Sequence, residues 1–170
     1  MKKSYVYYFV VILFCVAILF IPYKNALVIE RENSGAISAY FDLNHGDRFE
    51  IQYTHSIHLS DVREYYQITR QGQIMQTKLI YEDYAIGMPS DALTGETFHI
   101  ENGKIVISNM KRNYPAIDLR TGQVVANHQI IVHDKITSFS DFIKPGSWVK
   151  IKFRKISVIE MVKGVNMSGK

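Results

Sequence analysis

The stretch FEIQYTHSIHLSDVREYYQI, residues 49–68, predicts a β-hairpin that decides how the middle of the chain folds. In each half, apolar and aromatic residues alternate with polar ones, which is the period of a strand with one buried face. A register that buries both sets together pairs Ile57 with Val62 and leaves HLSD as a short turn. The same register places His55 opposite Glu64 on the inward face, with Cβ atoms about 5 Å apart.

This register also pairs Tyr53 with Tyr66, so the predicted inward face carries several polar groups. A buried carboxylate is costly unless a partner compensates it, and an adjacent imidazole can supply a charge-assisted hydrogen bond. Two interpretations remain open: the pair satisfies itself within the core, or it lines a pocket for an anionic, hydroxylated or amino-bearing group. The candidate residues for these interpretations are His55, Glu64, Ser56, Tyr53, Tyr66 and Arg63.

The spacing of these residues favours neither nucleophilic nor metal chemistry. On a strand Ser56 points away from His55, and the sequence contains no G-x-S-x-G elbow. A zinc site built from His55, His58, Asp61 and Glu64 requires the turn to fold back over the strand ends. We therefore predict no catalytic residue, no metal and no cofactor. The remaining histidines are expected to be solvated, and these are His45, His99, His128 and His133.

The rest of the chain beyond Pro22 predicts an all-β domain. About ten short segments rich in β-branched and aromatic residues alternate with turns that contain Gly and Asn. The last candidate strand spans residues 156–162, and residues 138–143 predict one helical turn. The pattern is typical of an antiparallel sandwich or a partly closed barrel over residues 26–163, followed by a tail at 164–170. The longest loop, 84–96, is either functional or a plain connection, and its candidate residues are Gly87, Pro89 and Ser90.

Residues 1–25 form a separate N-terminal segment with a short basic head and an apolar stretch from Tyr5 to Ile21. A retained transmembrane anchor, a cleaved signal peptide and a core helix are all considered. The anchor is favoured, because no polar face recurs at helical spacing and no small residue precedes the candidate cleavage site at Ala26. With Lys2 and Lys3 on the cytoplasmic side, we expect a single pass through the cytoplasmic membrane and an extracytoplasmic domain.

The formal net charge of +4 overstates how basic the domain is. Three lysines flank the N-terminal segment, and the other 17 basic residues nearly balance the 16 acidic ones. No general nucleic-acid role is therefore expected. One local feature is the stretch WVKIKFRK, in which Lys150, Lys152 and Arg154 share one strand face. This basic stripe is either a solvated face that protects a sheet edge or a contact for anionic lipid headgroups or an acidic partner.

Three short motifs carry a family resemblance. They are YTHSI at residues 53–57, VRE at residues 62–64 and YAIGMP at residues 84–89. With them the chain resembles domain-of-unknown-function family 1850 from about Ala26 to Val162. The resemblance implies a short protein with an N-terminal signal or anchor and no established activity. Genes of that family often neighbour tripartite ATP-independent periplasmic transporters, which implies an accessory role. It marks as positions of interest His55, Ser56, Glu64, Gly87 and Pro89.

The leading hypothesis is a non-enzymatic, membrane-anchored extracytoplasmic β domain that assists such a transporter. It is expected to dock on the permease or its solute-binding protein, or to hold a small ligand near His55 and Glu64. The alternative is a hydrolase or metal-dependent enzyme in which His55 is the general base and Glu64 orients it.

Overall fold

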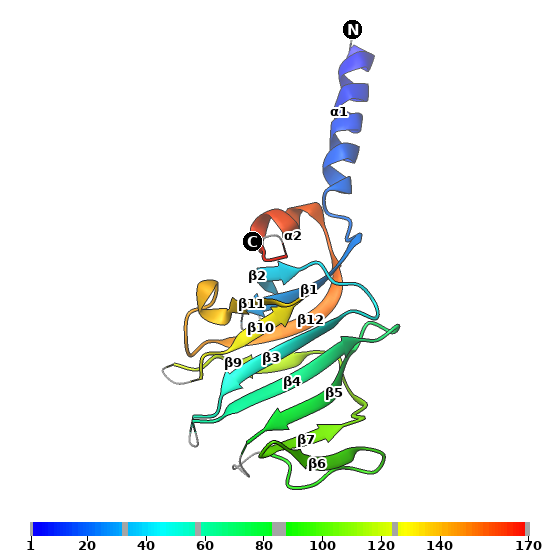
Figure 1. The fold of residues 1–170 in the computed structure, drawn as a ribbon. Coiled ribbons are helices and arrows are strands. Elements are labelled where there is room, and N and C mark those ends of the chain that lie inside the picture. The colour runs from blue at the N-terminus through cyan, green and yellow to red at the C-terminus, as the bar shows by residue number, and fades with distance from the viewer. Residues whose placement is uncertain (1, 32–33, 57–58, 83–87, 124–125, 169–170) are drawn as a thin grey trace.

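The computed structural model describes residues 2–31, 34–56, 59–82, 88–123 and 126–168, and this part of the chain is mostly β (Figure 1). Within these described ranges, thirteen strands form two sheets, accompanied by two α-helices and one short 3-10 helix. The prediction of an all-β domain built from short strands is confirmed. Across the described ranges no ladder joins the two sheets, so the partly closed alternative is wrong.

The five-stranded sheet combines the two ends of the domain, in the order β13-β2-β1-β12-β9. Its ladders are antiparallel except between β13 and β2. The short strand β13 therefore adds part of the expected tail to this sheet. The bounds are β1 Lys24–Arg31, β2 Ala36–Phe41, β9 Ile117–Arg120, β12 Trp148–Ile156 and β13 Val165–Asn166.

The eight-stranded sheet contains the hairpin of the opening stretch at its centre, in the order β11-β10-β3-β4-β5-β7-β6. The remaining strand, β8, pairs with the first half of β5, whereas β7 pairs with the second half. The bounds of the central strands are β3 Arg48–Thr54, β4 Asp61–Ile68, β5 Ile74–Tyr81 and β10 Gln129–Val132. Those of the outer strands are β6 Thr97–Glu101, β7 Lys104–Ser108, β8 Arg112–Tyr114 and β11 Lys135–Ser138.

The two sheets pack face to face through one shared hydrophobic core. Strands β1, β2 and β12 contribute one side of this core, and β3, β4, β5 and β10 contribute the other. A second cluster lies on the inner face of β4, β5 and β7. Alternate residues of β3, β4, β5 and β12 are buried, so the outer faces of these strands are left largely to polar side chains. The outer face of β1 and β2 instead holds a third apolar cluster, in which Ala26, Val28 and Tyr40 pack with Ile156 and Met161. Large members of the shared core are Leu27, Phe41, Phe49, Ile51, Ile68 and Ile151.

Two short helices lie near the C-terminal end of the chain. The 3-10 helix η1, Phe139–Asp141, occupies the place of the predicted helical turn. The prediction of a strand at 156–162 is wrong for most of its length, since α2 spans Val158–Lys163. Ser157 and Glu160 form a capping box, in which each side chain accepts a hydrogen bond from the other residue's backbone N–H. This pair starts a helix despite the β-branched residues that follow.

The N-terminal helix α1, Lys2–Ile18, projects away from the β body (Figure 1). Every side chain from Tyr5 to Ile21 is exposed. No helix in the described part of the chain is both long and apolar enough to be classed as a membrane span. The base of α1 is tied to the domain, because Ile159 N–H donates to Leu19 O at 3.2 Å and Tyr23 N–H donates to Ile156 O at 3.1 Å.

Candidate functional site

The hairpin formed by β3 and β4 differs in register from the one predicted. Ile51 pairs with Glu64, Phe49 with Tyr66 and Tyr53 with Val62. The predicted pairing of His55 with Glu64 and of Tyr53 with Tyr66 is therefore wrong.

His55 lies beyond the end of β3 instead. Its N–H donates to Ser60 O at 2.8 Å, and its carbonyl accepts from Leu59 N–H at 2.9 Å. Ile57 and His58 lie outside the described residues. The enzyme hypothesis needed Glu64 to orient the His55 ring, and the observed ladder removes that geometric basis.

The face assignment of the hairpin is nevertheless confirmed. The observed register differs from the predicted one by an even number of residues, and a shift of this kind moves no side chain to the other face. Ile51, Tyr53, Glu64 and Tyr66 therefore all project from the same, inner face of the sheet. What the shift changes is the length of the connection and the identity of the cross-strand neighbours.

Glu64 is the centre of a polar cluster on this inner face. The Tyr66 hydroxyl donates a hydrogen bond to Glu64 Oε2 at 2.8 Å. Burial raises the pKa of Glu64, and the hydrogen bond from Tyr66 opposes the increase. Burial likewise raises the pKa of Tyr53 and of Tyr66, with the Glu64 carboxylate as the next cause. Gln76 of β5, which is buried, pairs with Tyr66 on the same face. We name Tyr53, Glu64, Tyr66 and Gln76 the inner cluster.

The imidazole in contact with this cluster is His128. Its ring stacks on that of Tyr53, with centroids 5.0 Å apart and an interplanar angle of 20°. The expectation that His128 is solvated is wrong, since the residue is only 8% exposed and burial lowers the pKa of its ring. The approach of His128 depends on the pairing of β10 with β3. A local sequence pattern carries no signal for that contact.

The other predicted site residues are distributed around the sheet. Ser56 is exposed in the turn after β3, and Arg63 is exposed on β4, whose alternation places it on the outer face, away from Glu64. In the predicted loop, Pro89 O accepts a hydrogen bond from the Tyr81 hydroxyl, and Ser90 is exposed. Gly87 lies outside the described residues.

The later part of this loop is fixed by an ion pair. Arg112 Nε and Nη2 donate to the two carboxylate oxygens of Glu96, both at 2.7 Å. The hydrogen bonds from Arg112 lower the pKa of Glu96. The loop therefore closes against β8 and β5. In the residues that the structure describes, no group of three or more His, Cys, Asp or Glu side chains is arranged to hold a metal ion.

The outer face of the eight-stranded sheet carries a groove of about 810 Å³. Its volume lies within the range of about 300–1,000 Å³ that is usual for small-molecule sites. The groove crosses β3, β4 and β5 and is bordered by the turn between β10 and β11. The polar and charged residues that line it include Asp47, Arg48, Glu50, Tyr65, Lys78, His133 and Asp134.

The charged residues of this groove are not paired with one another. The Lys78 ammonium lies over the ring of Tyr65, 5.4 Å from its centroid. Burial raises the pKa of Glu50, and the charges of Arg63 and Asp134 act on it in opposite directions. For the part of the chain that is described, neither a direct ion pair nor a side-chain hydrogen bond involves Arg48, Glu50, Arg63 or Asp134.

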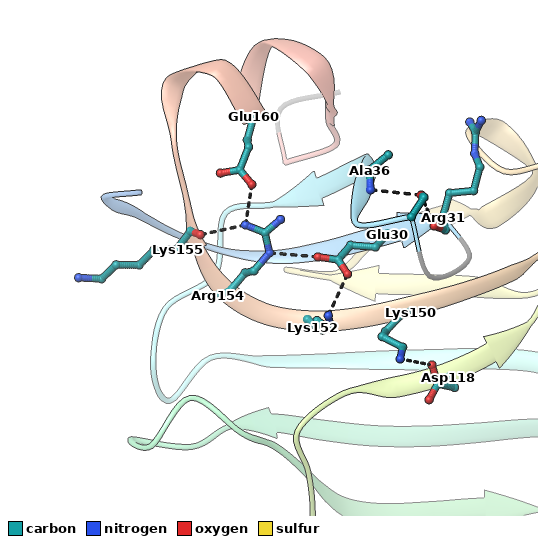
Figure 2. Close-up of polar contacts among 10 residues, drawn as sticks. Glu30, Arg31, Ala36, Asp118, Lys150, Lys152, Arg154, Lys155 and Glu160 are labelled. Atoms are coloured by element: carbon teal, nitrogen blue, oxygen red, sulfur yellow. Dashed lines mark hydrogen bonds and ion pairs between the residues drawn. The ribbon is translucent and has the colours of Figure 1, made fainter. Parts of the chain in front are cut away.

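The outer face of the five-stranded sheet shows the opposite arrangement (Figure 2). Lys152 Nζ lies 3.0 Å from Glu30 Oε2, and Arg154 Nε lies 3.1 Å from Glu30 Oε1. A second contact of 2.8 Å joins Arg154 to Glu160 of α2. Lys150 is 3.2 Å from Asp118.

The basic stripe therefore does share one strand face, as predicted, but three carboxylates neutralise its three cations. The expectation that it protects a sheet edge is wrong, because β12 lies between β1 and β9.

Comparison with known proteins places these features in a family. No curated protein and no solved structure matches the chain. The family described as Domain of unknown function (DUF1850) matches residues 49–139, which is more than half of the chain. This segment runs from β3 into η1 and contains the inner cluster and most of the groove. The chain belongs to the DUF1850 family.

Proposed function

We propose that the protein is a membrane-attached, extracytoplasmic accessory domain of a solute transporter, and that it binds a small charged ligand in the outer groove. The observation that carries the ligand-binding part is the groove itself, where charged side chains without ion partners surround a volume of small-molecule size. This site lies on the outer face of β3 and β4, away from Glu64 on the inner face and from His55 beyond the end of β3.

The attachment to a membrane rests on α1. A continuous set of exposed apolar side chains from Tyr5 to Ile21 is far larger than the patches that soluble monomers usually leave uncovered. The helix has 17 residues, which corresponds to about 26 Å at 1.5 Å per residue. With the turn that follows it, the segment approaches the roughly 30 Å of a hydrocarbon core. The basic residues Lys2 and Lys3 favour an extracytoplasmic position for the β domain.

The link to a transporter rests on the family to which the chain belongs. The expected partners are a permease of the tripartite ATP-independent periplasmic type or its solute-binding protein. An attached domain with a ligand groove suits this role, because it holds a binding site close to the membrane surface where the permease operates. Our proposal assigns no catalytic step to the protein and requires no cofactor.

The partner proposal is tested by affinity capture of the tagged full-length protein from its native membranes after gentle solubilisation. We expect the permease or the solute-binding protein to be recovered with the wild-type chain. A matched control is the Asp118→Asn variant, since Asp118 lies on the other sheet and its side chain is 62% exposed. This variant should recover the same partners. Recovery of neither protein with the wild-type chain contradicts the accessory role.

A further inference from the structure

The outer groove has an ordered arrangement of charge that follows from strand register. Ile131 of β10 pairs with Glu50 of β3, Glu50 pairs with Tyr65 of β4, and Tyr65 pairs with Lys78 of β5. These four residues form one row across the sheet. Neighbouring strands are about 4.8 Å apart, so the backbones of Glu50 and Lys78 are separated by roughly 10 Å, with the Tyr65 ring between them. The row therefore has an acidic side and a basic side.

The residues next to this row add charges of both signs, with Arg48 on the acidic side because it shares β3 with Glu50. Asp134 borders the groove at the turn after β10 and adds a second carboxylate on the side of Glu50. Arg48 lies two positions before Glu50 on β3, and Arg63 lies two positions before Tyr65 on β4. None of these side chains forms a direct ion pair within the described chain. Cations and carboxylates of similar number thus lie close together without neutralising one another.

This arrangement contrasts with that of the five-stranded sheet, where the same residue types are joined in pairs. There Glu30 is 5% exposed and contacts both Lys152 and Arg154. The comparison shows that this fold can bring opposite charges on a sheet face into contact. In the groove they stay apart, and Glu50 is partly buried without an ion partner. Arg63 and Lys78 act on Glu50 only from a distance. A carboxylate that loses water without a cation in direct contact is costly, so a ligand that supplies such a cation gains free energy there.

The charge of the ligand follows from these neighbours. Arg48 and Lys78 attract a simple anion, but Glu50 and Asp134 repel it. For a simple cation, the two carboxylates are attractive and the two basic residues are repulsive. A molecule with both groups can place its ammonium on the acidic side and its carboxylate on the basic side. Building on the proposed ligand-binding role, we propose that the groove binds a small zwitterion, namely a free amino acid or a short peptide, over the ring of Tyr65.

The experiment measures binding to the full-length protein in nanodiscs by isothermal titration calorimetry. Each probe set uses an amino acid with an uncharged side chain: leucine, leucine amide and N-acetyl-leucine, and the same three forms of phenylalanine. Glycyl-leucine and leucyl-glycine separate the peptide source from the free amino acid. We expect at least one zwitterion to bind, and its amide and N-acetyl derivatives to bind at least tenfold more weakly, because each lacks one charge.

Variants assign this selectivity to the groove. Glu50→Gln should weaken binding of the zwitterion at least tenfold, while the affinity for the N-acetyl derivative stays the same or increases. Lys78→Gln should also weaken binding of the zwitterion at least tenfold, while the affinity for the amide stays the same or increases. Asp118→Asn is the control on the other sheet and should bind as the wild type does. Thermal melts of each variant verify that the fold is retained.

Two outcomes overturn the inference. If the N-acetyl derivative or the amide binds as tightly as the zwitterion and the groove variants abolish that binding, the ligand has a single charge and the proposed binding role stands. If no probe of any charge binds, or if the groove variants bind the zwitterion as the wild type does, the groove is not a zwitterion site. Affinity capture of the transporter proteins then decides separately whether the accessory role survives.

Discussion

Glu30 provides a sharp test of the charge network on the five-stranded sheet. We predict that Glu30→Ala lowers the free energy of unfolding by about 2 kcal/mol. Removing one partner of a fully buried ion pair typically costs about 3–5 kcal/mol, because the remaining charge is left without compensation. Here the side chains of Lys152 and Arg154 are 37% and 29% exposed, so water reaches them. Arg154 also keeps its contact with Glu160 at 2.8 Å. These two features reduce the expected cost.

The matched control is Asp118→Ala, which removes an ion pair on the same sheet face. The Asp118 side chain is 62% exposed, and surface pairs of this kind contribute about 0–1 kcal/mol. Both variants are unfolded with urea as the full-length chain in a mild detergent, and the transition is followed by circular dichroism. At about 1 M salt the effect of Asp118→Ala should disappear, whereas most of the Glu30→Ala effect should persist. If both variants lower the free energy of unfolding by the same small amount, Glu30 is not a buried carboxylate that compensates two cations.

Three further predictions concern other polar contacts. Burial raises the pKa of Glu64 above its ordinary value of 4.5. The free energy of unfolding should therefore fall as the pH rises from 4.5 to the raised pKa. The expected slope in this interval is about 1.4 kcal/mol per pH unit. Glu64→Gln should remove the part of this decrease that Glu64 contributes in urea titrations between pH 4 and 8, while the part from Glu50, whose pKa burial also raises, remains. A loss of equal size at every pH contradicts the assignment. Arg112→Lys should lower the free energy of unfolding by about 1–2 kcal/mol, because an ammonium cannot reproduce the two hydrogen bonds to Glu96. Amide hydrogen exchange over residues 88–96 should accelerate, while exchange in β3 should stay constant. Ser157→Ala should lower the free energy of unfolding in urea by about 1 kcal/mol, because α2 loses its N-cap. The conservative control Ser157→Thr should retain most of the stability.

The hairpin shows both the power and the limit of the sequence pattern. Alternation along residues 49–68 correctly assigned Glu64 and Tyr66 to the inner face, because only the parity of a residue decides which face it occupies. The same alternation is unchanged by an even shift of register, so it cannot select one pairing among several. The preference for a short turn selected the wrong one and produced the incorrect contact between His55 and Glu64.

Two other differences have distinct causes. The start of α2 has a local signal, since Ser157 and Glu160 are spaced as a capping box, but the apolar β-branched residues around them favoured a strand. The groove has no local signal, because its border depends on β10 pairing with β3 across about eighty positions of the sequence. Contacts of this kind follow from the topology of the sheet, and the alternation of a single strand does not encode them.

The junction at the base of α1 has a consequence for how a partner encounters the domain. Only residues 19–23 separate α1 from β1, and backbone hydrogen bonds from Tyr23 and Ile159 restrict them further. A domain on a long flexible linker samples many orientations, and its effective concentration at any one surface is correspondingly diluted. If α1 is embedded in a bilayer, as we propose, this body has little freedom to turn, and each diffusional collision in the plane of the membrane presents nearly the same side.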